Sequence, residues 1–280
     1  MKEFKKSYVV ILLITLIVCS IIAGALVVKE KNEKNAKKIA MEEAAKRIIN
    51  YNTLTEVDIN EEHIKDAYAK VSKADDFIFK YAGFNEGDVP NEFKLRIAYA
   101  NYEGELIELG EEYFNENGDN YAIYLQSMYS EMEKVFGYNT EYTPGNFSAL
   151  DDDFGTGNGY PFFKHNKDKL RFETNFEFGG SIKGFVNQKL IKAEGFQDEL
   201  YLYVVPAYYK LQYSKYNDEL YDVFSDYDYV SQKYSNSLKE KVEYTEEIDE
   251  ELIDKLDTYK YTFKRDDVDY FLVGIDKLGK

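Results

Sequence analysis

Tryptophan, cysteine and histidine are almost missing from this chain of 280 residues, which has no Trp, one Cys and two His. Two imidazoles, His63 and His165, are too few for a histidine-rich metal centre. The sole cysteine, Cys19, lies in a long apolar run, so no cysteine nucleophile is expected elsewhere. H-E-x-x-H and G-x-S-x-G motifs are also missing from the sequence. We interpret His63 as a solvent-facing or capping residue and His165 as part of a polar turn, and we expect no cofactor.

Positive charge is scarce outside the N-terminus. The chain has a formal net charge of −17. Residues 1–38 contain eight lysines and three glutamates, a net +5, so the remaining residues carry −22. Because an acidic surface repels a phosphate backbone, nucleic acid is not an expected partner. The net negative charge does not indicate a particular binding partner, because acidic surfaces usually keep a protein soluble.

Residues 8–28 form an apolar run, YVVILLITLIVCSIIAGALVV, without a charged side chain. A helix rises about 1.5 Å per residue, so the run from Tyr8 to Val28 is long enough to span a hydrocarbon core of about 30 Å. We therefore predict a retained single-pass transmembrane anchor. Two alternatives start from a signal sequence. Ala23-Gly24-Ala25 has the form cut by signal peptidase, which leaves cleavage open, whereas a lipoprotein signal is discarded because Val18 stands where a small residue should precede Cys19.

The body after the anchor is predicted to lie outside the cytoplasmic membrane. Lysines flank the apolar run on both sides, so the positive-inside count does not decide the orientation. The body contains no cysteine, which suits an oxidising compartment. A long body behind a short basic tail usually translocates. We expect a single-pass protein of the cell membrane with an extracytoplasmic body.

The first half of the body has the apolar spacing of helices, with hydrophobic residues recurring every three or four positions. The predicted helices cover residues 36–50, 61–83, 89–104 and 119–137. Asn60 is expected to cap the second of them. Gly83 and Gly137 are expected to end the second and fourth.

After Gly137 the hydrophobic period changes to two, which indicates strands. Residues 170–178 place Leu170, Phe172 and Thr174 on one face of a predicted strand. The other predicted elements are two long strands in 183–212 joined around Gln197-Asp198, a strand pair or irregular segment in 218–234, a short acidic helix in 246–256, and a hairpin in 259–276 that turns at 265–267. Pro206 fits an edge strand or a bulge.

Helices followed by strands predict an α+β fold with an antiparallel sheet and a C-terminal helix–hairpin. The expected regions are 1–38 (tail, anchor and basic stalk), 39–137 (helical) and 138–280 (antiparallel sheet). The anchor, SEMEKVFG (130–137) and LDTYKYTFKRDDVDYFLVGID (256–276) together resemble uncharacterised membrane-anchored proteins of low-GC Gram-positive bacteria. That resemblance carries no catalytic or binding residue. The element order is also similar to the cystatin-like and nuclear transport factor 2-like folds, by analogy only.

The stretch DDDFGTGNGY, residues 151–160, is the most site-like segment of the sequence. Its carboxylates and alternate glycines fail the EF-hand spacing, and as a phosphate loop it lacks a lysine and a following helix. We interpret it as a surface connection, with Asp151 and Asp153 as weak candidates for a cation site.

Tyrosine and phenylalanine are abundant, at 27 and 19 residues. Exposed tyrosines on a strand could stack on sugars or peptides, and YLYVVPAYYKLQYSKY (201–216) is the candidate surface. The alternative is that these rings fill a core. The sequence as a whole favours a non-enzymatic domain that binds a protein or polymer of the cell envelope. An envelope hydrolase is the alternative, and it requires a carboxylate pair with a raised pKa in a pocket.

Overall fold

The computed structural model describes residues 51–109, 118–138, 140–149, 162–177, 184–215, 218–228, 231–243, 247–267 and 269–279. The chain divides into two units, Met1–Ile49 and Asn50–Lys280, and every described residue belongs to the second. The predicted anchor Tyr8–Val28, the predicted helix 36–50 and the loop 151–160 lie outside the described residues. Within the described ranges, no helix combines the length and apolar character needed to cross a membrane.

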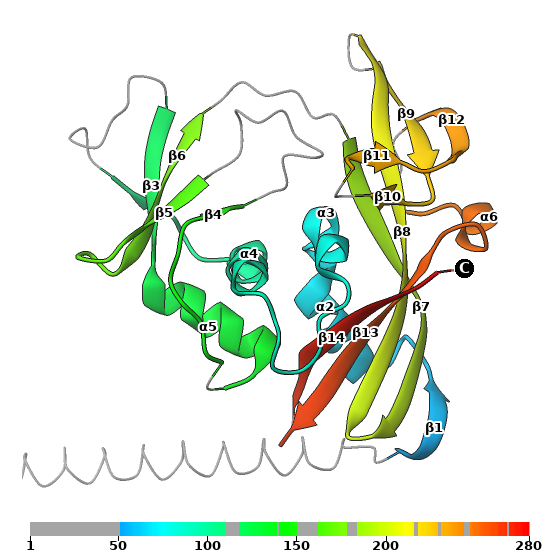
Figure 1. Ribbon diagram of the computed structural model, residues 1–280, viewed down its shortest axis with the longest axis horizontal. Coiled ribbons are helices and arrows are strands. Elements are labelled where there is room, and N and C mark those ends of the chain that lie inside the picture. The colour runs from blue at the N-terminus through cyan, green and yellow to red at the C-terminus, as the bar shows by residue number, and fades with distance from the viewer. Residues whose placement is uncertain are drawn as a thin grey trace, which may run out of the picture. The chain divides into compact units, whose positions relative to one another are not determined.

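The larger of the two main sheets has seven antiparallel strands (Figure 1). Its main path runs β1-β7-β8-β13-β14, and β9 joins β8 and pairs in turn with β12. The strands are β1 (Tyr51–Val57), β7 (Gly184–Gln197), β8 (Glu199–Lys215), β9 (Asp218–Phe224), β12 (Ser237–Glu243), β13 (Thr258–Asp266) and β14 (Asp269–Gly279). The two long strands expected in 183–212 are confirmed, and Gln197 forms their turn with φ +56°. The mixed α+β class with antiparallel sheets is likewise confirmed.

Pro206 is predicted to lie in an edge strand or at a bulge, and the first of these two alternatives is wrong because strand β8 lies inside the sheet. On the edge of β8 away from β7, pairing with β13 extends to Val204, and pairing with β9 begins at Tyr208. Pro206 lies between these two stretches and faces Gln188 of β7 in the register. A residue without an N–H group is tolerated where the hydrogen-bond ladder changes partner.

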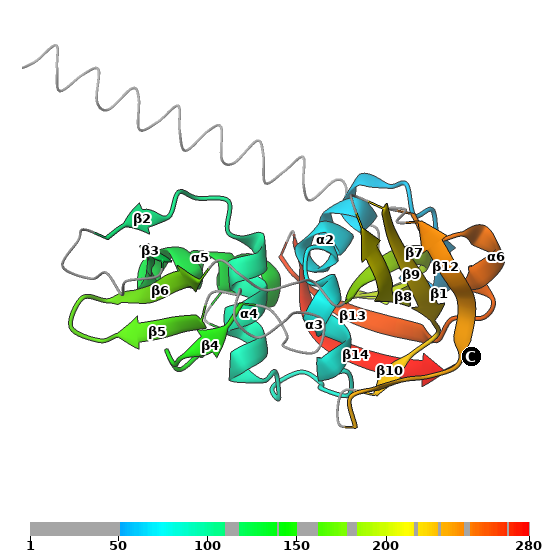
Figure 2. The same ribbon diagram turned by 90° about the horizontal axis from the view of Figure 1, so that it is seen from above.

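Short helices cover both faces of the large sheet (Figures 1 and 2). They are α2 (Glu62–Ser72), α3 (Asp75–Ile78), the 3₁₀ helix η1 (Phe79–Tyr81) and, on the opposite face, α6 (Glu250–Ile253). One hydrophobic cluster joins α2, α3 and η1 to the inner face through fully buried side chains such as Ile64, Phe77 and Tyr261. A second cluster packs Leu252 of α6 against Val205 and Tyr221.

The helix predicted for 61–83 is interrupted. It ends at Ser72, and the chain continues as α3 and η1 before Gly83, which has φ +105°. Asn60 does not cap it, because Glu61 holds the cap position and both the backbone N–H and the side-chain amide of Asn60 donate to Asp58. Ala74, which lies between the end of α2 and the start of α3, is fully buried.

The second main sheet has five antiparallel strands in the order β2-β3-β6-β5-β4. Two helices, α4 and α5, pack against it around buried Phe147, Phe163 and Phe172. The elements are β2 (Ile107–Glu108), β3 (Gly118–Tyr124), β4 (Phe147–Ser148), β5 (Phe162–Asn166), β6 (Arg171–Glu177), α4 (Asn91–Asn101) and α5 (Leu125–Phe136). The helix expected for 89–104 is therefore confirmed with shorter bounds.

The helix predicted for 119–137 is wrong over its first third. Residues up to Tyr124 belong to β3, which pairs with β6 from Gly118↔Glu177 to Tyr124↔Arg171. Pairing with a strand some fifty positions away thus overrides the local helical spacing. Only the part from Leu125 is helical, and it ends before Gly137 as expected. Because β1, β2 and β3 fall between residues 39 and 137, that region is not purely helical.

The C-terminal predictions hold with adjusted bounds. The segment 218–234 forms β9 and a small separate ribbon of β10 (Tyr227–Asp228) and β11 (Lys233–Tyr234). The acidic helix expected in 246–256 is the shorter α6. The predicted hairpin is β13–β14, where Phe263 lies opposite Leu272 and Asp267 turns with φ +54°. A register shift at Thr262/Phe263 then places Tyr261 opposite Ile275.

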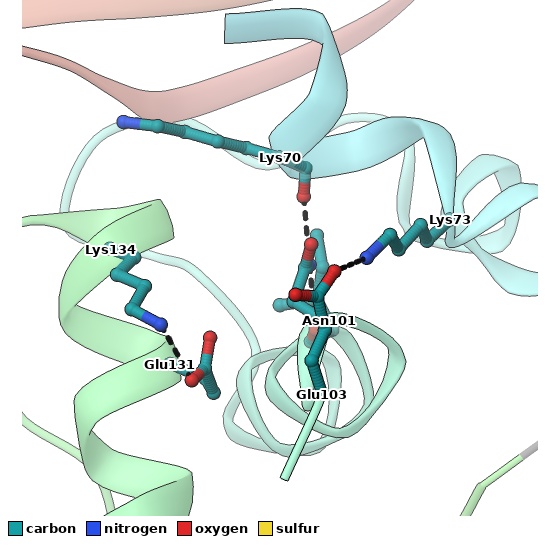
Figure 3. A network of polar contacts seen from close by, with 7 residues as sticks. Lys70, Lys73, Asn101, Glu103, Glu131 and Lys134 are labelled. Carbon is teal, nitrogen blue, oxygen red and sulfur yellow. Dashed lines mark hydrogen bonds and ion pairs between the residues drawn. The ribbon is translucent and has the colours of Figure 1, made fainter. Parts of the chain in front are cut away.

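Polar contacts tie the end of α2 to the end of α4 (Figure 3). The Asn101 side chain donates to the carbonyl of Lys70 at 3.0 Å, and the Lys73 ammonium lies 2.5 Å from the Glu103 carboxylate. The Lys70 side chain continues to β14, where it donates to Asp269 at 2.9 Å and to the carbonyl of Tyr270 at 2.6 Å. Lys70 therefore links the helices to the last hairpin of the large sheet.

Candidate functional site

An open groove lined by tyrosines lies where α5 begins, on the side of the small sheet. We call it the tyrosine groove. Its volume is about 600 Å³, and it is lined by Tyr124, Leu125, Gln126, Tyr129, Tyr142, Lys169 and Leu170. Three sequence segments therefore meet here: the junction of β3 with α5, the segment before β4, and the turn between β5 and β6. Unlike the aromatic residues of the cores, Tyr124 is 55% exposed.

The base of the tyrosine groove is fixed by the backbone. Tyr124 ends β3 opposite Arg171, and the next residue, Leu125, starts α5. The N–H of Leu125 donates to the carbonyl of Leu170 at 3.0 Å. This bond satisfies one of the N–H groups that a helix leaves without an intrahelical partner. It also joins the β5–β6 turn to the start of the helix.

Leu170 is unusual in both conformation and exposure. Its φ is +49°, in the left-handed region that costs a residue with a side chain about 1–2 kcal/mol. Its side chain is nevertheless 62% exposed, so core packing does not account for the choice of leucine. A large apolar residue in a strained, exposed position next to tyrosines is a feature that structural stability does not explain. The expectation that Leu170 shares the buried face of its strand with Phe172 is wrong.

Tyr142 is held in place on both sides. The Lys94 ammonium donates to the carbonyl of Glu141 at 2.6 Å. Asn91 of α4 accepts from the N–H of Thr143 at 2.8 Å and donates to its carbonyl at 2.7 Å. The Tyr142 ring then stacks on Tyr129, with ring centroids 5.5 Å apart and planes inclined by 24°. The two rings together form one wall of the tyrosine groove.

The two stacked tyrosines remain neutral near pH 7. Burial, followed by a hydrogen bond to Glu133, raises the pKa of Tyr129. Burial, followed by the nearby Tyr129, raises the pKa of Tyr142. Because the ordinary pKa of tyrosine is already about 10, both hydroxyls keep their protons and can take part in hydrogen bonds.

The strand predicted as the tyrosine surface, 201–216, is mainly a core strand. Tyr208 and Tyr209 are buried. Tyr201 and Tyr203 lie on the outer face of the large sheet, half-buried, beside a hollow of about 350 Å³. The Tyr203 hydroxyl donates to Glu194 at 2.5 Å, and burial together with Glu199 raises the pKa of Tyr201 to about 12. These hydroxyls are thus engaged by neighbouring carboxylates.

A second large hollow lies between α6 and the strands β9 and β12. Its volume is about 660 Å³, and four carboxylates and Lys239 line it together with apolar side chains. One of these carboxylates, Asp249, is held in an ion pair. Lys239 lies against Asp249, and hydrogen bonding to this ammonium lowers the pKa of the Asp249 carboxyl.

The hydrolase alternative requires a carboxyl group with a raised pKa. Among the described residues, the carboxyl groups with displaced pKa values are displaced downward: Asp58, Glu103, Glu194 and Asp249.

The two histidines are separate from the tyrosine groove and from each other. His63 stacks on Tyr270 at 6.0 Å between ring centroids and lies 3.5 Å from Glu61. Burial lowers the pKa of His63. His165 lies in strand β5 opposite Phe172, not in the polar turn expected for it. Asp151 and Asp153 lie outside the described residues, and the described ranges contain no group of three or more potential metal ligands.

Comparison with known protein families, with curated proteins and with solved structures finds no match for this chain. A function for the chain therefore has to be inferred from its own sequence and geometry.

Sequence reasoning did not find the tyrosine groove. Its residues come from three segments that only the β3–β6 pairing and the β5–β6 turn bring together. One local signal was present. Tyr124 and Tyr129 lie in the predicted helix 119–137 but outside its apolar stripe of Leu125, Met128 and Met132. Aromatic residues off a core stripe are candidates for a binding surface.

Proposed function

We propose that this chain is a single-pass, membrane-anchored protein with an extracytoplasmic body that binds a component of the cell envelope through the tyrosine groove. The observation that carries the proposal is the exposed, left-handed Leu170 beside the stacked pair Tyr129–Tyr142. The apolar run Tyr8–Val28 supports the anchor, and the cysteine-free body supports an oxidising compartment.

Binding without catalysis fits the chemistry of the groove. Among the described residues, its lining consists of three phenol rings, two leucines, one amide and one ammonium, with no carboxylate. Such a surface can hold a ligand by ring contacts and hydrogen bonds. This lining has no general base matched to a nucleophile. A groove on an anchored body would keep an envelope component close to the membrane.

A retention assay tests this function. Full-length chain in detergent micelles is mixed with insoluble envelope material, and the bound fraction is measured at increasing protein concentration. Removing the exposed ring with Tyr124→Ala should weaken retention about tenfold, as expected for an aromatic contact worth about 1–2 kcal/mol. Tyr138, which is 73% exposed and lies outside the groove, provides the matched control Tyr138→Ala. Equal retention of both variants and the parent chain would contradict the proposal.

Topology is tested separately by protease digestion of the body in intact and in lysed cells. Digestion in intact cells is the expected result. Protection until lysis would place the body in the cytoplasm and would direct the search to cytoplasmic partners.

A further inference from the structure

The segment 140–146, between α5 and β4, brings Tyr142 to the tyrosine groove. It has neither helix nor strand of its own. Because such a segment lacks a ladder of backbone hydrogen bonds, contacts with other elements must fix the orientation of its side chains. One such contact is the packing of the half-buried Tyr142 ring beside the hydrophobic cluster of the small sheet. The others come from α4.

Helix α4 holds the backbone on both sides of Tyr142. Asn91, the first residue of α4, accepts from the N–H of Thr143 at 2.8 Å and donates to its carbonyl at 2.7 Å. This exchange of one donor and one acceptor is the pairing that a neighbouring strand would provide. One turn further along the helix, Lys94 donates to the carbonyl of Glu141 at 2.6 Å. The two neighbours of Tyr142 are therefore both tied to α4.

The needs of the helix do not explain the asparagine at position 91. Asparagine is a poorer helix former than alanine, and its usual contribution to a helix is to cap the N-terminus with its side chain. Here Pro90 holds the cap position, and no side chain caps α4. The Asn91 amide instead bonds twice to a residue 52 positions away. These contacts serve the segment 140–146 and not α4.

Resting on the proposed function, we infer that Asn91 is a positioning residue of the tyrosine groove. It is not among the described residues that line the groove. It holds the backbone at Thr143 so that the Tyr142 ring stacks on Tyr129 and this wall meets the ligand. Asn91 thus acts on binding through Tyr142.

The two end residues of α4 provide matched variants. The amide of Asn101, the last residue of the helix, also makes two hydrogen bonds, at 3.0 Å to the carbonyl of Lys70 (Figure 3) and at 2.9 Å to that of Ile97. Neither of these bonds reaches the segment 140–146. Full-length chains in detergent micelles are compared by retention on insoluble envelope material. Asn91→Ala should weaken retention about three- to tenfold, up to the loss caused by Tyr142→Ala, and Asn101→Ala should leave it unchanged.

A second substitution separates helix stability from positioning. Asn91→Asp keeps the acceptor for the N–H of Thr143 but turns a carboxylate oxygen towards its carbonyl. An acidic side chain is favourable in the first turn of a helix, so α4 itself should not be weakened. Retention should nevertheless fall as far as in Asn91→Ala. Hydrogen exchange of the segment 140–146, measured without envelope material, should be faster in both variants than in the parent chain.

A double-mutant cycle tests whether Asn91 acts through Tyr142. In the Tyr142→Ala background, Asn91→Ala should cause no further loss of retention, because the ring that it positions is already missing. In the Tyr124→Ala background, Asn91→Ala should cause the same fold-loss as in the parent chain. A general structural effect would instead lower retention in both backgrounds.

Two results would overturn the inference. The first is full retention of Asn91→Ala while Tyr124→Ala is still weakened, which would leave the proposed function standing and assign the placement of Tyr142 to packing alone. The second is an undiminished loss from Asn91→Ala in the Tyr142→Ala background. Retention that does not depend on Tyr124 at all would refute the proposed function, and the inference with it.

Discussion

Replacing Leu170 separates a binding role from a structural one. Leu170→Gly and Leu170→Ala both remove the side chain from the tyrosine groove, but glycine alone accepts φ +49° without strain. If the leucine is kept for binding, both variants should lose retention on envelope material to a similar degree. Their stabilities should differ, because the backbone strain remains in the alanine variant and is removed in the glycine variant.

The size of that difference depends on the exposure of the side chain. Leu170 is 62% exposed, so truncation removes roughly a third of the about 1.5–3 kcal/mol that full burial of a leucine contributes, or about 0.5–1 kcal/mol. Relief of the left-handed strain contributes about 1–2 kcal/mol in the glycine variant, and the extra freedom of unfolded glycine costs about 0.5–1 kcal/mol. The free energy of unfolding of the glycine variant should therefore lie within about 1 kcal/mol of that of the parent chain. It should be about 1 kcal/mol higher than that of the alanine variant.

The assay is denaturant unfolding of the full-length chain in micelles. Because the chain has no tryptophan, the transition is followed by circular dichroism, and the free energy of unfolding is obtained by linear extrapolation. Asp168→Gly in the same turn is the control and should destabilise by about 0.5–1 kcal/mol, since it adds freedom and relieves no strain. If the alanine variant is as stable as the glycine variant, the argument that the backbone is strained at Leu170 is refuted. If both variants are retained on envelope material as well as the parent chain, the binding role of the Leu170 side chain is refuted.

Other predictions concern the cores and the pH dependence. Phe163→Ala removes a fully buried ring stacked 4.9 Å from Phe147 and should cost about 3–5 kcal/mol of unfolding free energy; a loss below about 1 kcal/mol would contradict the packing. Gly184→Ala would place its Cβ 2.2 Å from the carbonyl oxygen of Tyr209, so it should destabilise by about 1–3 kcal/mol, and an unchanged midpoint would show that β7 and β8 can separate there. Burial lowers the folded-state pKa of His63 below about 6.5, so the unfolded chain binds more protons, and His63 contributes stability that is lost as pH falls from neutrality through the folded pKa. His63→Gln should reduce this loss, as measured by unfolding at pH 7 and pH 5, and an equal loss in both chains would assign it to other groups.

Strands with local turn signals were predictable from the sequence. Gln197-Asp198 separates two apolar alternating runs, and the structure turns there. The charged residues 265–267 likewise mark the β13–β14 turn. In both cases the partner strands are neighbours along the chain, so local turn chemistry and period are sufficient to specify the pairing.

The tyrosine groove could not be predicted in the same way. The strand β3 carries the residues Tyr-Ala-Ile-Tyr, whose spacing continues that of the following helix. Pairing with β6 on one side and with β2 on the other makes them a strand. Leu170 reads as the first residue of an alternating strand, and its left-handed φ depends on the length of the β5–β6 turn. The groove is a product of tertiary pairing, and no local pattern specifies where three distant segments will meet.

The change of partner at Pro206 has a consequence for the order of folding. The hairpins β7–β8 and β8–β9 join neighbouring segments, whereas β13 pairs with the first part of β8 from more than fifty positions away. Local contacts close sooner than distant ones, because less chain entropy is lost in forming them. During synthesis, which proceeds from the N-terminus, residues 199–204 therefore expose one open strand edge until the last hairpin is complete. Truncations that remove residues 258–279 should leave a chain prone to aggregation through this edge, and aggregation should be absent when the last hairpin is supplied as a separate peptide that pairs with it.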